Sequence, residues 1–214
     1  KIFLRIKVKG KENLPDEGGV IVMSNHISAF DPPLLAAIFS RPVRFMAKKE
    51  LFENPIIRIA LFLNGAFPVD RSKNDITAVK KALSLLKEQE VLGLFPEGTR
   101  HAEGKLGNPK AGSVMLAIKS SVPILPVGIK NIKSNGRITI NIGKPFNLDQ
   151  FAKKKLSKDE RKKAAQFIKD KIQNVKNKRI KNFLMNWFTS SQSRLHKMNR
   201  YMLKHNRHVG PLNG

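Results

Sequence analysis

The chain has 214 residues and carries 41 lysine and arginine residues against 16 aspartate and glutamate residues, a formal net charge of +25. Because 41% of the residues are hydrophobic, the chain can form a core, and the charge predicts an anionic partner: a nucleic acid, an anionic membrane surface, or an acidic substrate or carrier protein. The sequence contains no cysteine, which excludes disulfides, cysteine-ligated metals and a thiol nucleophile.

Segments with the periodicity of strands and of helices alternate along most of the chain. Strands are predicted at 5–10, 19–25, 43–49, 65–70, the start of 91–100, 124–132 and 137–143, with a turn at 134–136. Helices are predicted at 34–39, 54–64, 74–90 and 111–121. The helix at 74–90 has Asn74 or Asp75 as its expected cap, and its expected core stripe is Ile76, Val79, Leu83 and Leu86.

This alternation predicts a single α/β domain with a mostly parallel, mixed sheet flanked by helices, which we place at residues 1–175. Residues 176–214 are predicted to form a basic helical tail, because the chain from residue 171 onward has ten lysine and arginine residues and no aspartate or glutamate. One helical face of this tail is apolar: Ile180, Phe183, Leu184, Trp187 and Phe188. That face is expected either to contact a membrane or to pack on the domain or a second subunit.

Three polar clusters directly follow predicted strands, where α/β sheets bind their ligands. They are 25–31, 70–71 and 97–100. In the first cluster, a carboxylate at Asp31 can orient the imidazole of His26 so that the ring accepts a proton. The alternatives are a helix cap for Asp31 and a backbone-bonded loop imidazole for His26. Ser28 fits a turn hydroxyl better than a nucleophile, so the substrate is expected to supply the attacking hydroxyl.

The third cluster, LFPEGTR, predicts a tight turn that presents the guanidinium of Arg100 to a phosphate, or else a β-turn with a solvated arginine. A P-loop is excluded, because five residues separate Gly98 from Gly104 and Leu106 stands where serine or threonine is required. No metal site is expected, since the histidines of the tail have no acidic neighbours.

Four segments together resemble the boxes of the glycerolipid acyltransferase family: NHISAFD, GAFPVDR, LFPEGTR and VPILPVGI, in this order between residues 25 and 129. The nearest likeness is to bacterial 1-acyl-sn-glycerol-3-phosphate (lysophosphatidic acid) acyltransferases. By this resemblance His26 is the general base and Asp31 its partner, and residues near Pro123 support the site from the fourth box. The residues implied at the acceptor phosphate are Lys48, Arg71, Glu97, Gly98, Thr99 and Arg100, with Lys49 as the alternative lysine.

The resemblance implies transfer of an acyl chain from acyl-CoA or acyl-ACP to the sn-2 hydroxyl of lysophosphatidic acid, making phosphatidic acid for phospholipid biosynthesis, with no metal or redox cofactor. Alternative acceptors are glycerol-3-phosphate, dihydroxyacetone phosphate and another lysophospholipid. The alternative from another class is a non-enzymatic nucleic-acid-binding module. Against it, cationic residues are spread along the chain, aromatic residues make up 7%, and no base-reading motif is present.

The implied acceptor is a membrane lipid, so we expect a peripheral protein at the cytoplasmic face of the cell membrane. Its expected partners are the lysophospholipid, the anionic membrane surface and, if it is the donor, acyl carrier protein; nucleic acid is not expected. No spanning segment is predicted, since the apolar run at 56–69 includes Arg58 and Asn64. The chain opens on Lys1 rather than Met, and family members commonly carry a membrane-holding N-terminal segment, so an upstream segment is expected.

Overall fold

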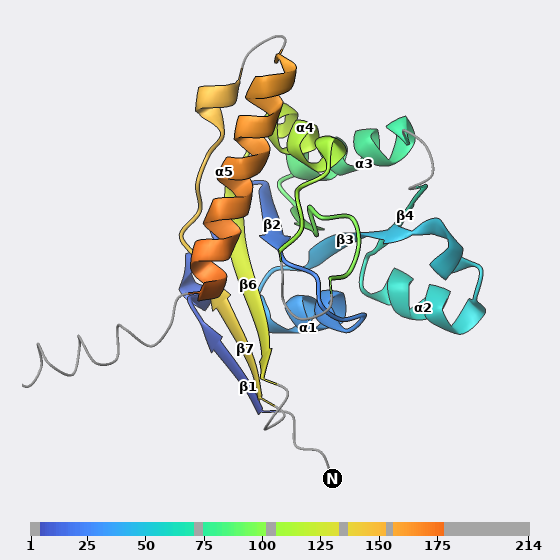
Figure 1. The fold of residues 1–214 in the computed structure, drawn as a ribbon. Helices are drawn as coiled ribbons and strands as arrows, with labels where there is room; N and C mark the ends of the chain where they lie inside the picture. Colours follow the sequence, from blue (N-terminus) through green and yellow to red (C-terminus); the bar gives the residue numbers. More distant parts are fainter. Residues whose placement is uncertain (1–4, 71–74, 102–105, 133–136, 153–155, 178–214) are drawn as a thin grey trace, which may run out of the picture. The chain divides into compact units, whose positions relative to one another are not determined.

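In the computed structural model, the described residues are 5–70, 75–101, 106–132, 137–152 and 156–177 (Figure 1). They form a seven-stranded sheet in the order β1-β7-β6-β2-β5-β3-β4. The strands are β1 (Arg5–Lys9), β2 (Val20–Ser24), β3 (Val43–Lys48), β4 (Phe67–Val69), β5 (Val91–Leu94), β6 (Ile124–Ile132) and β7 (Arg137–Ile142). The α-helices are α1 (Asp31–Ile38), α2 (Pro55–Leu63), α3 (Ile76–Lys87), α4 (Ala111–Ser120) and α5 (Lys158–Asn177). Short 3-10 helices are η1 (Lys11–Asn13), η2 (Lys49–Phe52) and η4 (Asp149–Phe151).

Strand directions follow the prediction of a mostly parallel, mixed sheet. Strands β6, β2, β5, β3 and β4 are mutually parallel. Strand β7 pairs antiparallel with β6, and β1 pairs parallel with β7, so two strands at one edge run the other way. The order places β2 beside β5, and therefore brings the ends of those two strands, with the clusters that follow them, next to each other.

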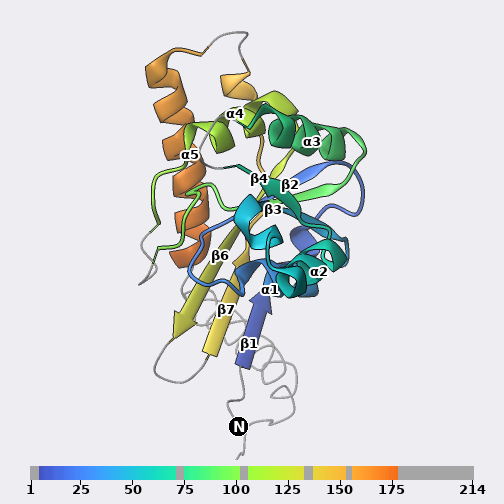
Figure 2. The same cartoon turned by 90° about the vertical axis from the view of Figure 1, so that its right-hand side faces the viewer.

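The central strand β2 separates two hydrophobic core layers. Its side chains alternate between them: Ile21 and Met23 pack in the layer formed with α3, α4 and α5, while Val20 and Val22 pack in the layer formed with α1. All four are fully buried, which explains the unbroken apolar run in the sequence. Figures 1 and 2 show α1 and α2 on the opposite side of the molecule from α3 and α4.

Two details differ from the sequence-based predictions. Ile76 does not join the core stripe of α3 and is 66% exposed, because it is the first residue of the helix; the buried residues of α3 are Ala78, Ala82, Leu85 and Leu86. Asp75 caps this helix, its carboxylate accepting a hydrogen bond from the backbone of Ala78. Helix α5 lies where no element was predicted, and its buried residues recur every fourth position: Ala164, Ile168, Ile172 and Lys176.

The predicted turn at 134–136 and the predicted tail face at 180–188 lie outside the described residues. The basic tail therefore stays a prediction. Helix α5 itself continues through Asn177, across the domain boundary predicted at residue 175.

Helix α5 and strand β6 approach closely at Gly128, where an added Cβ would run into the backbone of Lys176. We expect Gly128→Ala to lower the free energy of unfolding by about 1–3 kcal/mol, measured by urea denaturation, because backbone atoms must move apart. Gly112→Ala is the matched control: its Cβ would meet nothing within 4 Å, so this change in helix α4 should leave stability unchanged or raise it. Equal midpoints for Gly128→Ala and the unmodified protein would contradict this packing.

Candidate active site

The loop from the end of β2 to the start of α1 is organised around one carboxylate oxygen. Oδ2 of Asp31 accepts hydrogen bonds from the backbone N–H groups of Ile27 and Ser28, at 2.7 and 2.8 Å. It also lies 2.9 Å from Nδ1 of His26. Asp31 makes no capping bond to its own helix, and residue Phe30 occupies the cap position. The helix-cap interpretation of Asp31 is therefore wrong, because its carboxylate points back to the preceding loop rather than into the helix.

This arrangement fixes the orientation of the imidazole of His26. An ionised carboxylate only accepts, so Nδ1 carries a proton and donates it to Asp31, which leaves the lone pair of the neutral ring on Nε2. Nε2 has no hydrogen-bond partner among the described residues. The ring stacks on Phe95 with centroids 4.1 Å apart, and its side chain is 12% exposed. The geometry suits a base that takes a proton at Nε2.

Ser28 is a turn residue, as predicted. Its hydroxyl accepts a hydrogen bond from the backbone N–H of Phe30, 3.2 Å away, and its carbonyl accepts one from the N–H of Asp31. These bonds shape the loop that carries His26.

Glu97 is buried beneath the same loop, with 1% of its surface exposed. Oε1 accepts from the backbone N–H of His26 at 3.0 Å, and Oε2 accepts from the N–H of Gly107 at 2.6 Å. The Nε2 atom of His101 lies 3.5 Å from Oε2. A buried carboxylate repels a phosphate, so these contacts support a positioning role: Glu97 ties the end of β5 to the loop that holds the imidazole.

Asn25 connects the site to strand β6. Its side-chain amide donates to the carbonyl of Ile129 at 3.0 Å and accepts from the N–H of the same residue at 2.7 Å. Asn25 is 1% exposed, so both bonds are shielded from water. The fourth box thus contacts the site through Ile129, whereas Pro123 lies before β6 and accepts a bond from Ile21 at the opposite end of β2.

The turn after Glu97 is followed by a residue that is hydrogen-bonded to the His26 loop. Gly98 has a φ of 70°, a conformation that favours glycine, and its N–H donates to the carbonyl of Phe95. Thr99 and Arg100 are exposed, and the next residue, His101, donates its N–H to the carbonyl of His26 at 2.9 Å. The guanidinium of Arg100 makes no hydrogen bond or ion pair with the described residues. It is thus available to an anionic ligand.

The predicted lysine lies farther along the same edge of the sheet. Lys48 ends β3, is half exposed, and its Nζ lies 3.3 Å from the carboxylate of Glu50. The alternative, Lys49, donates to Asp70 at 2.8 Å, and this bond raises the pKa of Lys49. Within the described ranges, no hydrogen bond or ion pair joins Lys48 to the His26 loop. Arg71 lies outside the described residues.

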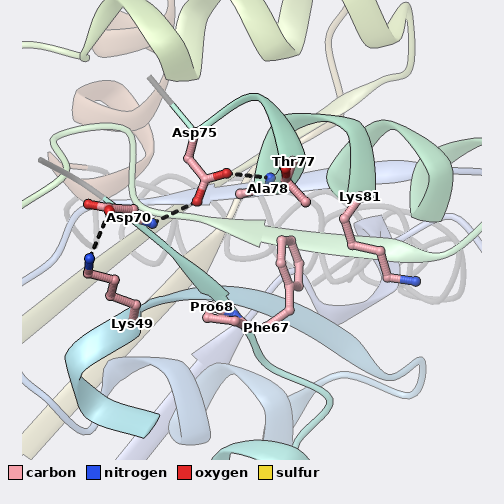
Figure 3. A pocket seen from close by; sticks show the side chains of 8 residues that line it. All are labelled: Lys49, Phe67, Pro68, Asp70, Asp75, Thr77, Ala78 and Lys81. Atoms are coloured by element: carbon pink, nitrogen blue, oxygen red, sulfur yellow. Dashed lines mark hydrogen bonds and ion pairs between the residues drawn. The ribbon is translucent and has the colours of Figure 1, made fainter. Parts of the chain in front are cut away.

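Asp70, which precedes Arg71, is held from two sides (Figure 3). Its carboxylate accepts from Lys49, and its backbone N–H donates to Asp75 at 2.9 Å. These residues line an open cavity of about 260 Å³ between β4, α3 and η2, whose lining does not include His26 or Asp31. Because β3 and β5 lie between β4 and β2, this cavity is separate from the imidazole.

A family model described as Acyltransferase matches residues 5–130. The chain belongs to the acyltransferase family. The protein named 1-acyl-sn-glycerol-3-phosphate acyltransferase of Borreliella burgdorferi is 34% identical over 179 residues, 79% of this acyltransferase and 70% of the relative. The protein of the same name from Bacillus subtilis is 35% identical over 154 residues, 69% of this chain and 76% of the relative.

The fold agrees with that assignment. A crystal structure of the 1-acyl-sn-glycerophosphate (LPA) acyltransferase PlsC from Thermotoga maritima matches with a TM-score of 0.63 and 29% sequence identity. The match covers 83% of this acyltransferase and 74% of the PlsC chain. The predicted α/β fold and the predicted family are therefore confirmed.

Three residues of the site were not found from the sequence: Asn25, Phe95 and His101. Asn25 and Phe95 stand inside the quoted boxes, yet a side chain that bonds across to β6 or stacks on an imidazole leaves no local pattern. His101 acts through its backbone N–H, which every residue except proline has, so its identity carried no signal.

We expect Glu97→Gln to lower both stability and activity. Glutamine offers one carbonyl oxygen where the carboxylate offers two acceptors, so the N–H of either His26 or Gly107 would face an amide donor. The free energy of unfolding should fall by about 1–3 kcal/mol, and kcat should fall because the imidazole loses its anchor. Glu88→Gln is the control, since its exposed carboxylate accepts a bond from Ser84 that an amide oxygen can also accept. If both variants keep full stability and turnover, Glu97 does not hold the loop.

Proposed function

We propose that this protein transfers an acyl chain from an acyl thioester to the sn-2 hydroxyl of 1-acyl-sn-glycerol-3-phosphate, giving phosphatidic acid for phospholipid synthesis. The observation that carries the proposal is the His26–Asp31 pair, because Nε2 of His26 has no hydrogen-bond partner among the described residues. The His26 loop also accepts a backbone hydrogen bond from His101, the residue after the exposed Arg100. The names of two relatives, each aligned with more than two thirds of this chain, support the choice of acceptor. The donor is the thioester of coenzyme A or of acyl carrier protein.

In the proposed reaction, Nε2 of His26 takes the proton of the acceptor hydroxyl as its oxygen attacks the thioester carbonyl. A C–O bond forms, the C–S bond breaks, and the proton passes from the imidazole to the departing thiolate. Asp31 stabilises the imidazolium between these two transfers. The chemistry requires neither a metal nor a redox cofactor.

Substrate positioning falls to the cationic residues at the carboxyl ends of the strands. Arg100 can bind the acceptor phosphate with a planar, two-pronged set of donors, and Lys48 and Arg71 are proposed to add charge. Holding the phosphate fixes the distance between the hydroxyl and the imidazole, which converts a bimolecular encounter into a reaction between positioned groups. Because the acceptor is a lipid, we propose that the protein works at the cytoplasmic face of the cell membrane.

A product assay tests this function. The full chain is incubated with a labelled acyl-CoA or acyl-ACP and, in separate reactions, with 1-acyl-sn-glycerol-3-phosphate, glycerol-3-phosphate, dihydroxyacetone phosphate and lysophosphatidylcholine. Labelled phosphatidic acid should be the main product and should fall to background in His26→Ala. Preferred labelling of another acceptor would show that the proposed acceptor is wrong, and labelling of none would contradict acyl transfer.

Arg100→Lys tests the phosphate contact. Lysine keeps the charge and loses the planar pair of donors, so KM for the acceptor should rise about tenfold or more while KM for the donor changes little. Steady-state kinetics with each substrate varied in turn would measure both constants. Arg161→Lys on the exposed surface of α5 serves as the control and should change neither. Equal increases in the two constants would place Arg100 outside the acceptor site.

A further inference from the structure

Helix α2 has a composition that does not match its surroundings. Its nine residues, PIIRIALFL, include a single charged side chain, and none of the nine is buried. Leu63 is 82% exposed and Ile56 is 79% exposed, and Ile57, Ile59 and Phe62 are exposed as well. Single exposed apolar residues are ordinary on a protein surface, whereas a contiguous set of this size marks a contact with another apolar phase.

The conformation and the position of helix α2 are fixed by specific contacts despite this exposure. Asn54 caps it by accepting bonds from the backbone of Ile56 and Ile57, and Pro55 occupies the first helical position. On its inner side, Leu61 packs against the core layer of α1. The exposed Phe62 contacts Phe52 edge to face. The outward residues are therefore held in place by the inward ones and form a fixed apolar surface.

That surface lies on the side of the molecule that carries the candidate active site. Leu61 of α2, Ile27 of the His26 loop and Phe95, which stacks on His26, all pack against the same core layer. Figures 1 and 2 place α1 and α2 at the same level of the molecule. Phe30, four residues after His26, is 76% exposed.

We propose that helix α2 inserts its exposed face into the surface of an anionic lipid bilayer and so holds the His26 site against the membrane. A helix of this length spans roughly 14 Å, too short to cross a bilayer, so it would lie in the plane of the headgroups with its apolar residues toward the acyl chains. None of the described helices is long and apolar enough to cross a membrane.

Charge favours this occupant. Arg58, the charged residue of α2, is exposed and has no ion pair with the described residues, so it can meet a lipid phosphate while the aliphatic residues beside it enter the acyl region. The flanking lysines Lys48 and Lys49 are partly neutralised by Glu50 and Asp70. The whole chain carries a formal net charge of +25, which attracts it to anionic lipid. Salt weakens the attraction between charges, whereas it has little effect on the apolar contact that insertion of α2 makes.

The choice of a lipid partner rests on the proposed function, since an acceptor embedded in a bilayer requires the site to reach the bilayer surface. The binding surface itself can be tested without turnover. The chain lacks cysteine, so one introduced cysteine carries a unique label. Leu63→Cys places it on the exposed face of α2, and Lys162→Cys places a control label on the exposed surface of α5, near the end of that helix farthest from α2 in Figures 1 and 2.

With an environment-sensitive fluorophore on the full chain, vesicles of phosphatidylcholine and phosphatidylglycerol should shift the emission of the Leu63→Cys label to the blue. Lipids brominated on the acyl chain should quench it, and the Lys162→Cys label should show neither change. An unshifted Leu63→Cys label on vesicle-bound protein would overturn the proposal. So would a label already shifted without vesicles, which would show that another part of the protein or a second copy covers α2.

Substitution tests the consequence for the reaction. Ile56→Ser with Leu63→Ser should weaken vesicle affinity about tenfold or more, since each side chain loses apolar burial. Ile76→Ser, an equally conservative change at an exposed isoleucine on α3, should leave affinity within about twofold. Acyl transfer to acceptor in vesicles should fall with affinity, while transfer to a short-chain, water-soluble acceptor should not. Unchanged affinity in the double variant would refute the proposal.

The proposed acyl transfer and the proposed membrane insertion of α2 can be contradicted independently of each other. Vesicle insertion at Leu63 without any acyl transfer would leave the membrane surface standing and remove the proposed function. Acyl transfer to a soluble acceptor without insertion at Leu63 would do the reverse.

Discussion

The carboxylate of Asp31 determines the shape of the site, because one oxygen accepts two backbone N–H groups and the Nδ1–H of His26. The two backbone bonds curl the chain after β2 so that the imidazole comes back over the start of α1. The same oxygen then selects the tautomer, and Nε2 is left as the basic atom. Around this centre the neighbouring strands act as supports: Glu97 after β5 holds the N–H of His26, and Asn25 ties the end of β2 to β6. The parallel order of β6, β2 and β5 is what makes all these contacts possible.

Much of the architecture could be predicted from local sequence, since each strand and helix of the α/β layers has its own apolar periodicity and the carboxyl ends of parallel strands meet at one edge. The pairing of His26 with Asp31 was also predictable, because both residues lie in the polar cluster that follows a predicted strand. The direction of the Asp31 carboxylate was not, because a helix cap and an imidazole partner have the same sequence, Asp followed by Pro. Nor could the part played by Glu97 be predicted: its bonds to His26 and Gly107 depend on burial under a loop from another strand. Helix α5 was missed because it buries only about one residue per turn, and most of the residues between them are charged or polar.

For helix α2, the sequence predicts the helix itself but not its position at the surface of the fold. Its apolar run was easily read as a helix, and an ordinary interpretation would place such a helix in the core. The fold instead leaves it on the surface, with Leu61 facing inward and its neighbours facing out. The His26 loop, Phe95 stacked on the imidazole, and Leu61 of the exposed apolar helix all pack against the same core layer, and the exposed Arg100 follows Phe95 in the next turn. In the proposed function, with an acceptor that has a charged head and an apolar chain, Arg100 would bind the phosphate and helix α2 would contact the lipid phase.

The central claim is that Asp31 orients the base rather than capping a helix, and turnover of Asp31→Asn tests it most directly. Asparagine can still accept bonds from the N–H groups of Ile27 and Ser28, so the loop and the fold should persist, with a loss of about 1 kcal/mol in stability. Its side chain cannot bear the charge that faces an imidazolium, so kcat should fall by about 10²–10⁴. Asp170→Asn on the exposed face of α5 should have no effect. A folded Asp31→Asn protein with nearly normal kcat would contradict the account.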